Sequence, residues 1–105
     1  MAQFDVYPNP NPRSQETVPY IVDVQSPLLD ALPTRLVMPL SRAGVMASGM
    51  PQRLVPVFSV GGEKLALHAY QSAGVDARLL KKRVASIRQH AGEIRDALDA
   101  VISGI

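Results

Sequence analysis

The spacing of apolar residues changes once along this chain, near residue 85, and this change is what most constrains its fold. Before it, apolar and polar residues alternate with the period of two typical of half-buried β-strands, as in Ala2, Phe4 and Val6. After it, apolar residues recur at the spacing of one amphipathic helix. No helical segment separates the predicted strands, so the sheet is expected to be antiparallel. The sequence predicts a mainly β protein, a small barrel or strongly bent sheet, with one C-terminal helix.

Several short strands are expected between about residues 2 and 84. The clearest hairpin is RLVPVFSV-GG-EKLALHAY, because Gly61-Gly62 suits the positive-φ positions of a two-residue turn. Pro56 cannot donate to a ladder, which places its strand at an edge or at a bulge. The proline-rich stretch from Pro8 to Pro19 is expected to be an exposed, mobile loop, and residues 41–50 at most one helical turn. The other predicted strands are Ala2–Tyr7, Tyr20–Val24, Leu36–Leu40 and a short one through Val75, Ala77 and Leu79.

The C-terminal helix is expected over about residues 86–103. Ser86 and Gln89 have the spacing of a capping box at its start, and Gly104 is placed to end it in a left-handed conformation. One continuous apolar stripe is formed by Ile87, Ala91, Ile94, Leu98, Val101 and Ile105.

Length and composition favour one globular domain over residues 1–105. The chain has no cysteine, which excludes disulfides and thiolate zinc sites. No apolar run approaches the ~20 residues of a membrane span, and the N-terminus lacks the pattern of a signal peptide. We therefore expect a cytoplasmic protein without a membrane contact.

The sequence contains no recognisable catalytic or cofactor motif. His68 and His90 lie on different predicted elements and have too few neighbouring ligands for a metal site. No serine lies in a nucleophile elbow, and Gly61-Gly62 opens no helix and so forms no phosphate loop. By elimination we expect a binding protein with no cofactor and no bound metal.

Basic residues gather in one part of the chain although the net charge is only +2. The cluster consists of Arg78, Lys81, Lys82, Arg83 and Arg88, with no acidic residue between them. Such a cluster is either an ordinary solvated face or a docking surface for an acidic partner.

Collinear stretches of the chain match one known family. They are QFDVY (Gln3 to Tyr7), YIVDVQSPLLD (Tyr20 to Asp30) with TRLVMPL (Thr34 to Leu40), and VPVFSVGGE (Val55 to Glu63). The terminal helix, ending in Gly104-Ile105, continues the pattern. Together they resemble the CcdB family, the toxin half of a bacterial toxin–antitoxin pair.

The resemblance implies the SH3-like barrel of plasmid toxins, a homodimer and no enzymatic activity. It implies binding to the DNA gyrase A subunit, which traps the cleaved-DNA complex. It also implies a cognate antitoxin with an acidic, disordered tail. This antitoxin neutralises the toxin, represses the operon together with it, and makes the contact with operator DNA.

The family's gyrase contact, carried over to matching positions, falls on Leu28, Leu29, Asp99, Ile102, Ser103, Gly104 and Ile105. Core packing is the alternative for Leu28, Leu29 and Ile105. Well-known members have tryptophan where this chain has Ser103 and asparagine where it has Asp99. The residues expected to receive the antitoxin tail are Pro8, Asn9, Pro10, Asn11, Pro12, Arg13, Arg78, Lys81, Lys82 and Arg83.

Two other functions remain open at this point. One is an endoribonuclease toxin of the same barrel fold, for which Arg35 and His68 are the available basic and acid–base residues. The other is a regulatory homologue that binds partners without being toxic.

Overall fold

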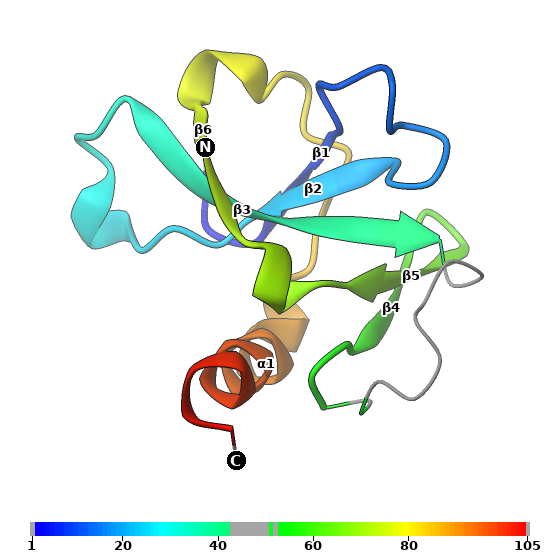
Figure 1. Cartoon of the computed structure of the whole chain (residues 1–105). Helices are drawn as coiled ribbons and strands as arrows, with labels where there is room; N and C mark the ends of the chain where they lie inside the picture. Colours follow the sequence, from blue (N-terminus) through cyan, green and yellow to red (C-terminus); the bar gives the residue numbers. More distant parts are fainter. Residues whose placement is uncertain (1, 43–50, 52, 105) are drawn as a thin grey trace.

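The computed structural model describes residues 2–42, 51 and 53–104. Its strands form one strongly bent antiparallel sheet in the order β4-β5-β3-β2-β1-β7, with β6 also paired to β3, and one helix packs against it (Figure 1). The strands are β1 (Asp5–Pro8), β2 (Tyr20–Asp23), β3 (Thr34–Arg42), β4 (Val57–Val60), β5 (Glu63–Leu67), β6 (Ala73–Asp76) and β7 (Ala85–Ser86). The helices are the short 3-10 turns η1 (Pro27–Leu29), η3 (Ala69–Gln71), η4 (Ala77–Leu79) and η5 (Arg88–His90), and α1 (Ala91–Ser103).

Strand β3 organises the sheet because it pairs with three neighbours. Along one edge it pairs with β2, and along the other its first residues pair with β6 and its last residues with β5. The sheet bends where β3 passes from β6 to β5, which nearly closes it into a barrel (Figure 1). The predicted fold class, an antiparallel barrel-like sheet with one C-terminal helix, is confirmed.

Both faces of the central strands are covered. The larger core lies between the sheet and α1 and includes Phe58, Leu65 and Ile94. A smaller core on the opposite face contains Tyr7, Ile21, Val37 and Leu80. The alternation of Ala2–Tyr7 was expected to mark a half-buried strand, but Asp5, Val6 and Tyr7 are all buried. The second core covers the face that the pattern assigned to solvent.

The first strand begins later than predicted. Phe4 has a left-handed backbone with φ of 72°, a conformation that is rare for a bulky residue and that interrupts an extended strand. β1 therefore starts at Asp5 rather than at Ala2.

The C-terminal helix also begins later than predicted. Ser86 belongs to β7, and α1 starts at Ala91, where His90 makes no side-chain capping bond, so the predicted capping box is wrong. Ile87 is buried before the helix begins, and its backbone N–H donates to the carbonyl of Phe4 at 2.9 Å. Pairing with the first strand thus decides the conformation of residues 85–87. The predicted end is right, because Gly104 is left-handed with φ of 73°.

In two further segments the observed elements agree only in part with the predicted ones. Val75 lies in β6 as expected, but Ala77 and Leu79 form the turn η4. Ser41 and Arg42 extend β3, whereas residues 43–50 lie outside the described residues. No helix in the described part of the chain is long and apolar enough to cross a membrane.

The Gly61-Gly62 hairpin is confirmed and provides a test of the fold. Val60 pairs with Glu63, and the two glycines have φ of 59° and 83°. A Cβ on Gly62 would meet no atom within 4 Å, so only the backbone conformation disfavours a side chain there. We expect Gly62→Ala to lower the free energy of unfolding by about 1–2 kcal/mol, as measured by urea denaturation.

Gly74→Ala is the matched control. Gly74 lies in β6 with equally open space around its Cβ position but without a positive φ. This variant should be neutral or slightly more stable. Equal losses in the two variants would contradict the explanation.

Candidate functional site

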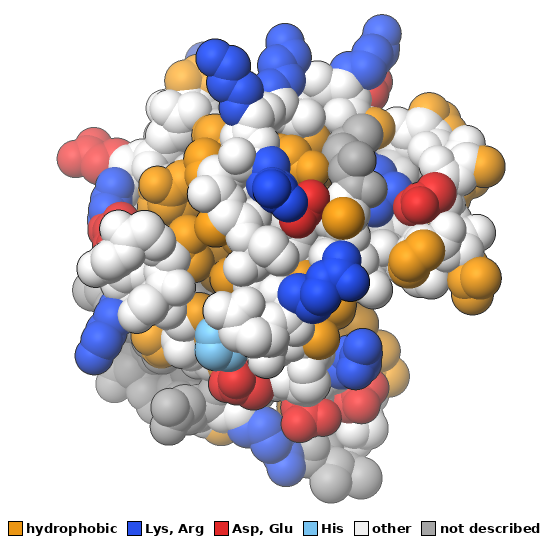
Figure 2. All heavy atoms as spheres, turned by 180° about the vertical axis from the view of Figure 1, so that it is seen from behind, with side chains coloured by type: hydrophobic (Ala, Val, Ile, Leu, Met, Phe, Trp, Pro, Cys, Tyr) orange, Lys and Arg blue, Asp and Glu red, His pale blue; other side chains and the backbone are white. Residues whose placement is uncertain are grey.

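The connection between β2 and β3 projects from the sheet and carries exposed leucines (Figure 1). In η1, Leu28 is 93% exposed and Leu29 is 48% exposed, so the core alternative for both residues is wrong. Leu32 in the same connection and Leu36 in β3, neither of which was expected to bind gyrase, are exposed as well. Seen from behind, this projecting lobe presents hydrophobic side chains at the right of Figure 2. An exposed apolar cluster of this kind is a candidate protein-binding surface.

A buried ion pair lies beneath the projecting turn. Nε of Arg35 donates to Oδ2 of Asp23 at 2.8 Å, and Nη1 of Arg35 donates to Oδ1 of Asp30 at 2.8 Å. Asp23 and Arg35 are almost fully buried, whereas the side chain of Asp30 is 57% exposed. Burial lowers the pKa of Arg35, but the hydrogen bonds to Asp23 and Asp30 outweigh it and raise the pKa above its usual value. The guanidinium therefore stays charged and links the sheet to the turn.

Gln25 makes a second link between the turn and the sheet. Its Nε2 donates to the carbonyl of Leu29 at 2.9 Å, and its Oε1 accepts the backbone N–H of Leu36 at 2.9 Å. Its own backbone N–H donates to Oδ1 of Asp23 at 3.0 Å. No motif in the sequence predicted this network, although a charged residue within an apolar strand, such as Asp23, indicates that the fold must supply a partner for it.

The end of α1 carries the other residues assigned to gyrase binding. Asp99, Ser103 and Gly104 are exposed, and Ile102 is 76% exposed. The hydroxyl of Ser103 donates to the carbonyl of Asp99 at 2.6 Å, so both residues belong to one helical turn. Ile105 lies outside the described residues. Figure 1 shows η1 and the end of α1 at separate places, so one protomer does not bring the two sets together.

The two segments assigned to the antitoxin meet in space. A hollow of about 410 Å³ is lined by Pro8, Asn9, Pro10, Gln15, Leu79, Lys81 and Lys82. Lysine and arginine side chains lie along the upper edge of the face shown in Figure 2. Within the described residues neither Lys81 nor Lys82 forms an ion pair. Their charges are available to an acidic ligand.

Two other basic residues of this cluster, Arg78 and Arg83, are already paired. Arg78 contacts Asp76 at 2.8 Å and Arg83 contacts Asp5 at 3.5 Å. The hydrogen bond from Arg78 lowers the pKa of Asp76 to about 2. Lys81, Lys82 and Arg88 therefore form no ion pair among the described residues, and of these three the two lysines line the hollow.

The loop after β1 is more ordered than its prolines indicated. Asn9 is buried, and its Nδ2 donates to the Ser14 hydroxyl at 2.9 Å and to the carbonyl of Val18 at 2.8 Å. Its own carbonyl accepts a hydrogen bond from Gln15 at 2.6 Å. The expectation of a wholly exposed segment is wrong for Asn9, since a loop this long needs an internal partner for its polar groups.

A second hollow adjoins the first and is more apolar. Its volume is about 470 Å³, and it shares Asn9 and Pro10 with the basic hollow. Its apolar lining consists of Val18, Ile21, Val37, Pro39, Ala73 and Val75. Together the two hollows form one groove, here called the loop groove, with an apolar part and a basic part.

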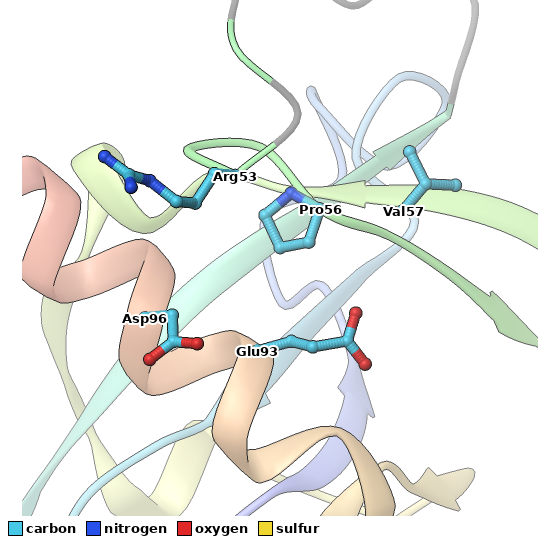
Figure 3. A pocket seen from close by; sticks show the side chains of 5 residues that line it. All are labelled: Arg53, Pro56, Val57, Glu93 and Asp96. Atoms are coloured by element: carbon cyan, nitrogen blue, oxygen red, sulfur yellow. The ribbon is translucent and has the colours of Figure 1, made fainter. Parts of the chain in front are cut away.

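A further hollow of about 300 Å³ lies between α1 and the segment that precedes β4. Figure 3 shows Arg53, Pro56 and Val57 on one side of it and Glu93 and Asp96 of α1 on the other. None of the residues that the sequence suggested for gyrase or antitoxin binding lines this hollow. Among the described residues, no cluster of histidine and acidic side chains is suited to a metal ion.

His68 belongs to a buried polar cluster, apart from Arg35. Its Nε2 is hydrogen bonded to the hydroxyl of Ser41, and its Nδ1 lies 2.9 Å from the hydroxyl of Tyr70. The backbone N–H of His68 donates to the carbonyl of Pro39, four residues along β3 from Arg35, or roughly 13 Å. The structure does not bring together the two residues considered for an endoribonuclease.

The environment of His68 predicts a pH dependence of stability. Burial lowers the pKa of His68, so the folded state favours the neutral ring. An unfolded histidine has a pKa near 6.5, so the unfolded state binds more protons as the pH falls below about 6.5. This contribution to stability is therefore complete above that pH and is lost below it, by up to about 1.4 kcal/mol per pH unit.

Urea denaturation between pH 7.5 and pH 5.5 tests this expectation. His68→Gln should lose less stability over this range than the unmodified protein. His90→Gln is the matched control, because it also replaces one histidine but leaves the contacts of His68 with Ser41 and Tyr70 in place, so the contribution of His68 to the slope should remain. Identical slopes for all three proteins would show that His68 does not cause the effect.

A comparison with protein-family models identifies the chain. The model described as CcdB protein matches residues 3–104. The match includes the projecting turn η1, the loop groove and helix α1, and it covers nearly the whole chain of 105 residues. The protein therefore belongs to the CcdB family, whose members are gyrase-targeting toxins of toxin–antitoxin systems.

Proposed function

We propose that this protein is a non-enzymatic toxin that binds the DNA gyrase A subunit and traps the cleaved-DNA complex. The observation that carries the proposal is the exposure of Leu28 at the tip of a turn that hydrogen bonds hold in place. A large apolar side chain kept in water at a projecting position gains free energy when a partner buries it. Residues 1–105 would act as a single toxin domain.

The contact with gyrase extends to the end of α1. Ile102 is the second strongly exposed apolar residue, and Asp99, Ser103, Gly104 and Ile105 accompany it in the proposal. Because η1 and this helix end lie apart in one protomer, a two-fold homodimer is the natural way to present several such contacts to one large target. We include this homodimer in the proposal.

The loop groove is the proposed site for the antitoxin. Its basic part, with Lys81 and Lys82, suits the carboxylates of an acidic tail, and its apolar part suits the tail's hydrophobic residues. Arg13 and the neighbouring residues 10–12 lie on the same loop, and Arg78 and Arg83 flank the lysines. The bound antitoxin would contact operator DNA and repress the operon together with the toxin.

The proposed gyrase contact predicts how binding changes when the Leu28 side chain is shortened. Leu28→Ala should weaken binding to the gyrase A subunit by about 10- to 100-fold, because it removes most of a side chain that the complex buries. The melting temperature should not change, since the Leu28 side chain is almost fully exposed and belongs to neither hydrophobic core. Titration of the gyrase A subunit and a growth assay in cells with normal or resistant gyrase measure the two effects.

Leu79→Ala is the control, because Leu79 is an exposed leucine in the loop groove rather than in η1. It should bind gyrase normally. If the unmodified protein does not bind gyrase and cells expressing it grow normally, the chain is a non-toxic regulatory homologue. Equal binding by Leu28→Ala and the unmodified protein would place the gyrase contact elsewhere.

The loop groove predicts an electrostatic contribution to antitoxin association. Changing Lys81 and Lys82 together to glutamine should slow association with the cognate antitoxin by about 3- to 10-fold at low salt. The difference should shrink as salt rises, because exposed charges are screened over ~10 Å at 0.1 M. Stopped-flow measurements at several salt concentrations provide the rates.

The control changes Lys64 and Arg95 to glutamine. Both are exposed basic residues on β5 and α1, away from the groove, so the net charge falls by the same amount. This variant should associate faster than the Lys81 and Lys82 variant. Equal rates for the two would mean that overall charge, rather than the groove, steers the antitoxin.

A further inference from the structure

We propose that Asp30 and Arg35 are positioning residues that hold η1 in the conformation in which Leu28 and Leu29 bind their target. Neither side chain needs to touch that target. The inference rests on the proposed function of these leucines, and it adds the device that prepares them for binding.

Apolar packing does not hold η1. None of its three residues is buried, so the turn contributes nothing to either hydrophobic core. A surface turn of this length with exposed apolar side chains would be expected to sample many conformations. Its order must come from its polar contacts.

Those contacts clamp the turn at its end. Gln25 holds the carbonyl of Leu29, the last residue of η1, and Arg35 holds the carboxylate of Asp30, the next residue along the chain. The start of the turn is capped separately, where the hydroxyl of Ser26 accepts the N–H of Leu28 at 3.2 Å. The two leucines therefore lie between a capped start and a clamped end.

Arg35 can act as a clamp because its own position is determined by the sheet. It lies in β3, and its Nε is bonded to Asp23 in the neighbouring strand β2. The planar guanidinium spans the distance from the buried carboxylate of Asp23 to the half-exposed carboxylate of Asp30. The rigid interior of the protein thus sets the place of an exposed turn.

Holding the turn in advance strengthens binding. A loop that is already in its bound conformation loses less conformational freedom when the partner arrives. Asp30 is the informative residue to change, because its carboxylate is half-exposed while Arg35 retains its buried partner Asp23. Removing Arg35 instead would leave the buried carboxylate of Asp23 without its partner, and removing Asp23 would leave the buried Nε of Arg35 without an acceptor, so either change threatens the fold itself.

The test compares Asp30→Asn with the unmodified protein. The variant should bind the gyrase A subunit about 3- to 10-fold more weakly, with a nearly unchanged melting temperature. Backbone amide exchange at Leu29 and Asp30, measured in the protein alone, should become faster. Asp30→Glu keeps the charge and should recover most of the affinity.

Glu63→Gln is the matched control. Glu63, in the β4–β5 hairpin, forms a partly exposed ion pair with Arg42 at the end of β3. The change therefore likewise removes one ion pair, but at a place away from η1. It should leave both gyrase affinity and the exchange of the η1 amides unchanged. An equal loss of affinity in this control would overturn the assignment to Asp30.

A double-mutant cycle separates positioning from direct contact. If Asp30 acts through the leucines, Asp30→Asn should cost much less affinity in a Leu28→Ala, Leu29→Ala background than in the unmodified protein. Fully additive losses would mean that Asp30 touches gyrase itself and would overturn the proposal, as would unchanged amide exchange.

The experiments distinguish a failure of the positioning role from a failure of the proposed gyrase contact. If Leu28→Ala weakens gyrase binding but Asp30→Asn does not, the positioning role is wrong and the gyrase contact stands. If Leu28→Ala has no effect, the gyrase contact at η1 is wrong, and the positioning role is overturned with it.

Discussion

The buried ion pair between Asp23 and Arg35 is the interaction on which the arrangement of this protein's surface depends. It joins β2 to β3 at a place where neither side chain reaches water. Removing two charges from water is costly, and replacing such a pair with apolar residues often leaves a protein equally stable. Stability alone is therefore a weak reason for the pair. The position of Arg35 is more informative, because the same guanidinium also donates to Asp30 and so connects the core to the projecting turn η1.

This arrangement separates the tasks of different parts of the molecule. The two hydrophobic cores hold the sheet and α1, while polar contacts order the exposed segments η1 and the loop after β1. Leucines that bind a partner, as proposed for Leu28 and Leu29, cannot also be buried in the protein's own core, so hydrogen bonds rather than packing hold the turn that carries them. The residues that line the loop groove are different from those of η1, so the contacts proposed for the antitoxin and for gyrase fall on two distinct surfaces.

Local signals in the sequence were sufficient for the elements whose geometry is set by neighbouring residues. The Gly61-Gly62 turn, the strands on either side of it and the left-handed end of α1 at Gly104 follow from backbone preferences alone. The errors arose where distant segments decide the outcome. Ser86 forms a strand rather than a helix start because it pairs with Asp5, more than eighty residues earlier. Asn9 is buried because Ser14 and Val18 supply its hydrogen-bond partners.

The sequence by itself determined the class of fold, the family and the types of residue available for binding. Period-two and helical patterns reflect local geometry, and the motifs from Gln3 to Glu63 can be read without coordinates. Only the tertiary structure decided that Leu28 and Leu29 lie in water, that Lys81 and Lys82 face the loop of residues 8–10, and that Arg35 pairs with Asp23 and Asp30 rather than with His68. Exposure and pairing depend on which segments the fold brings together, and spacing along the chain carries no measure of those distances.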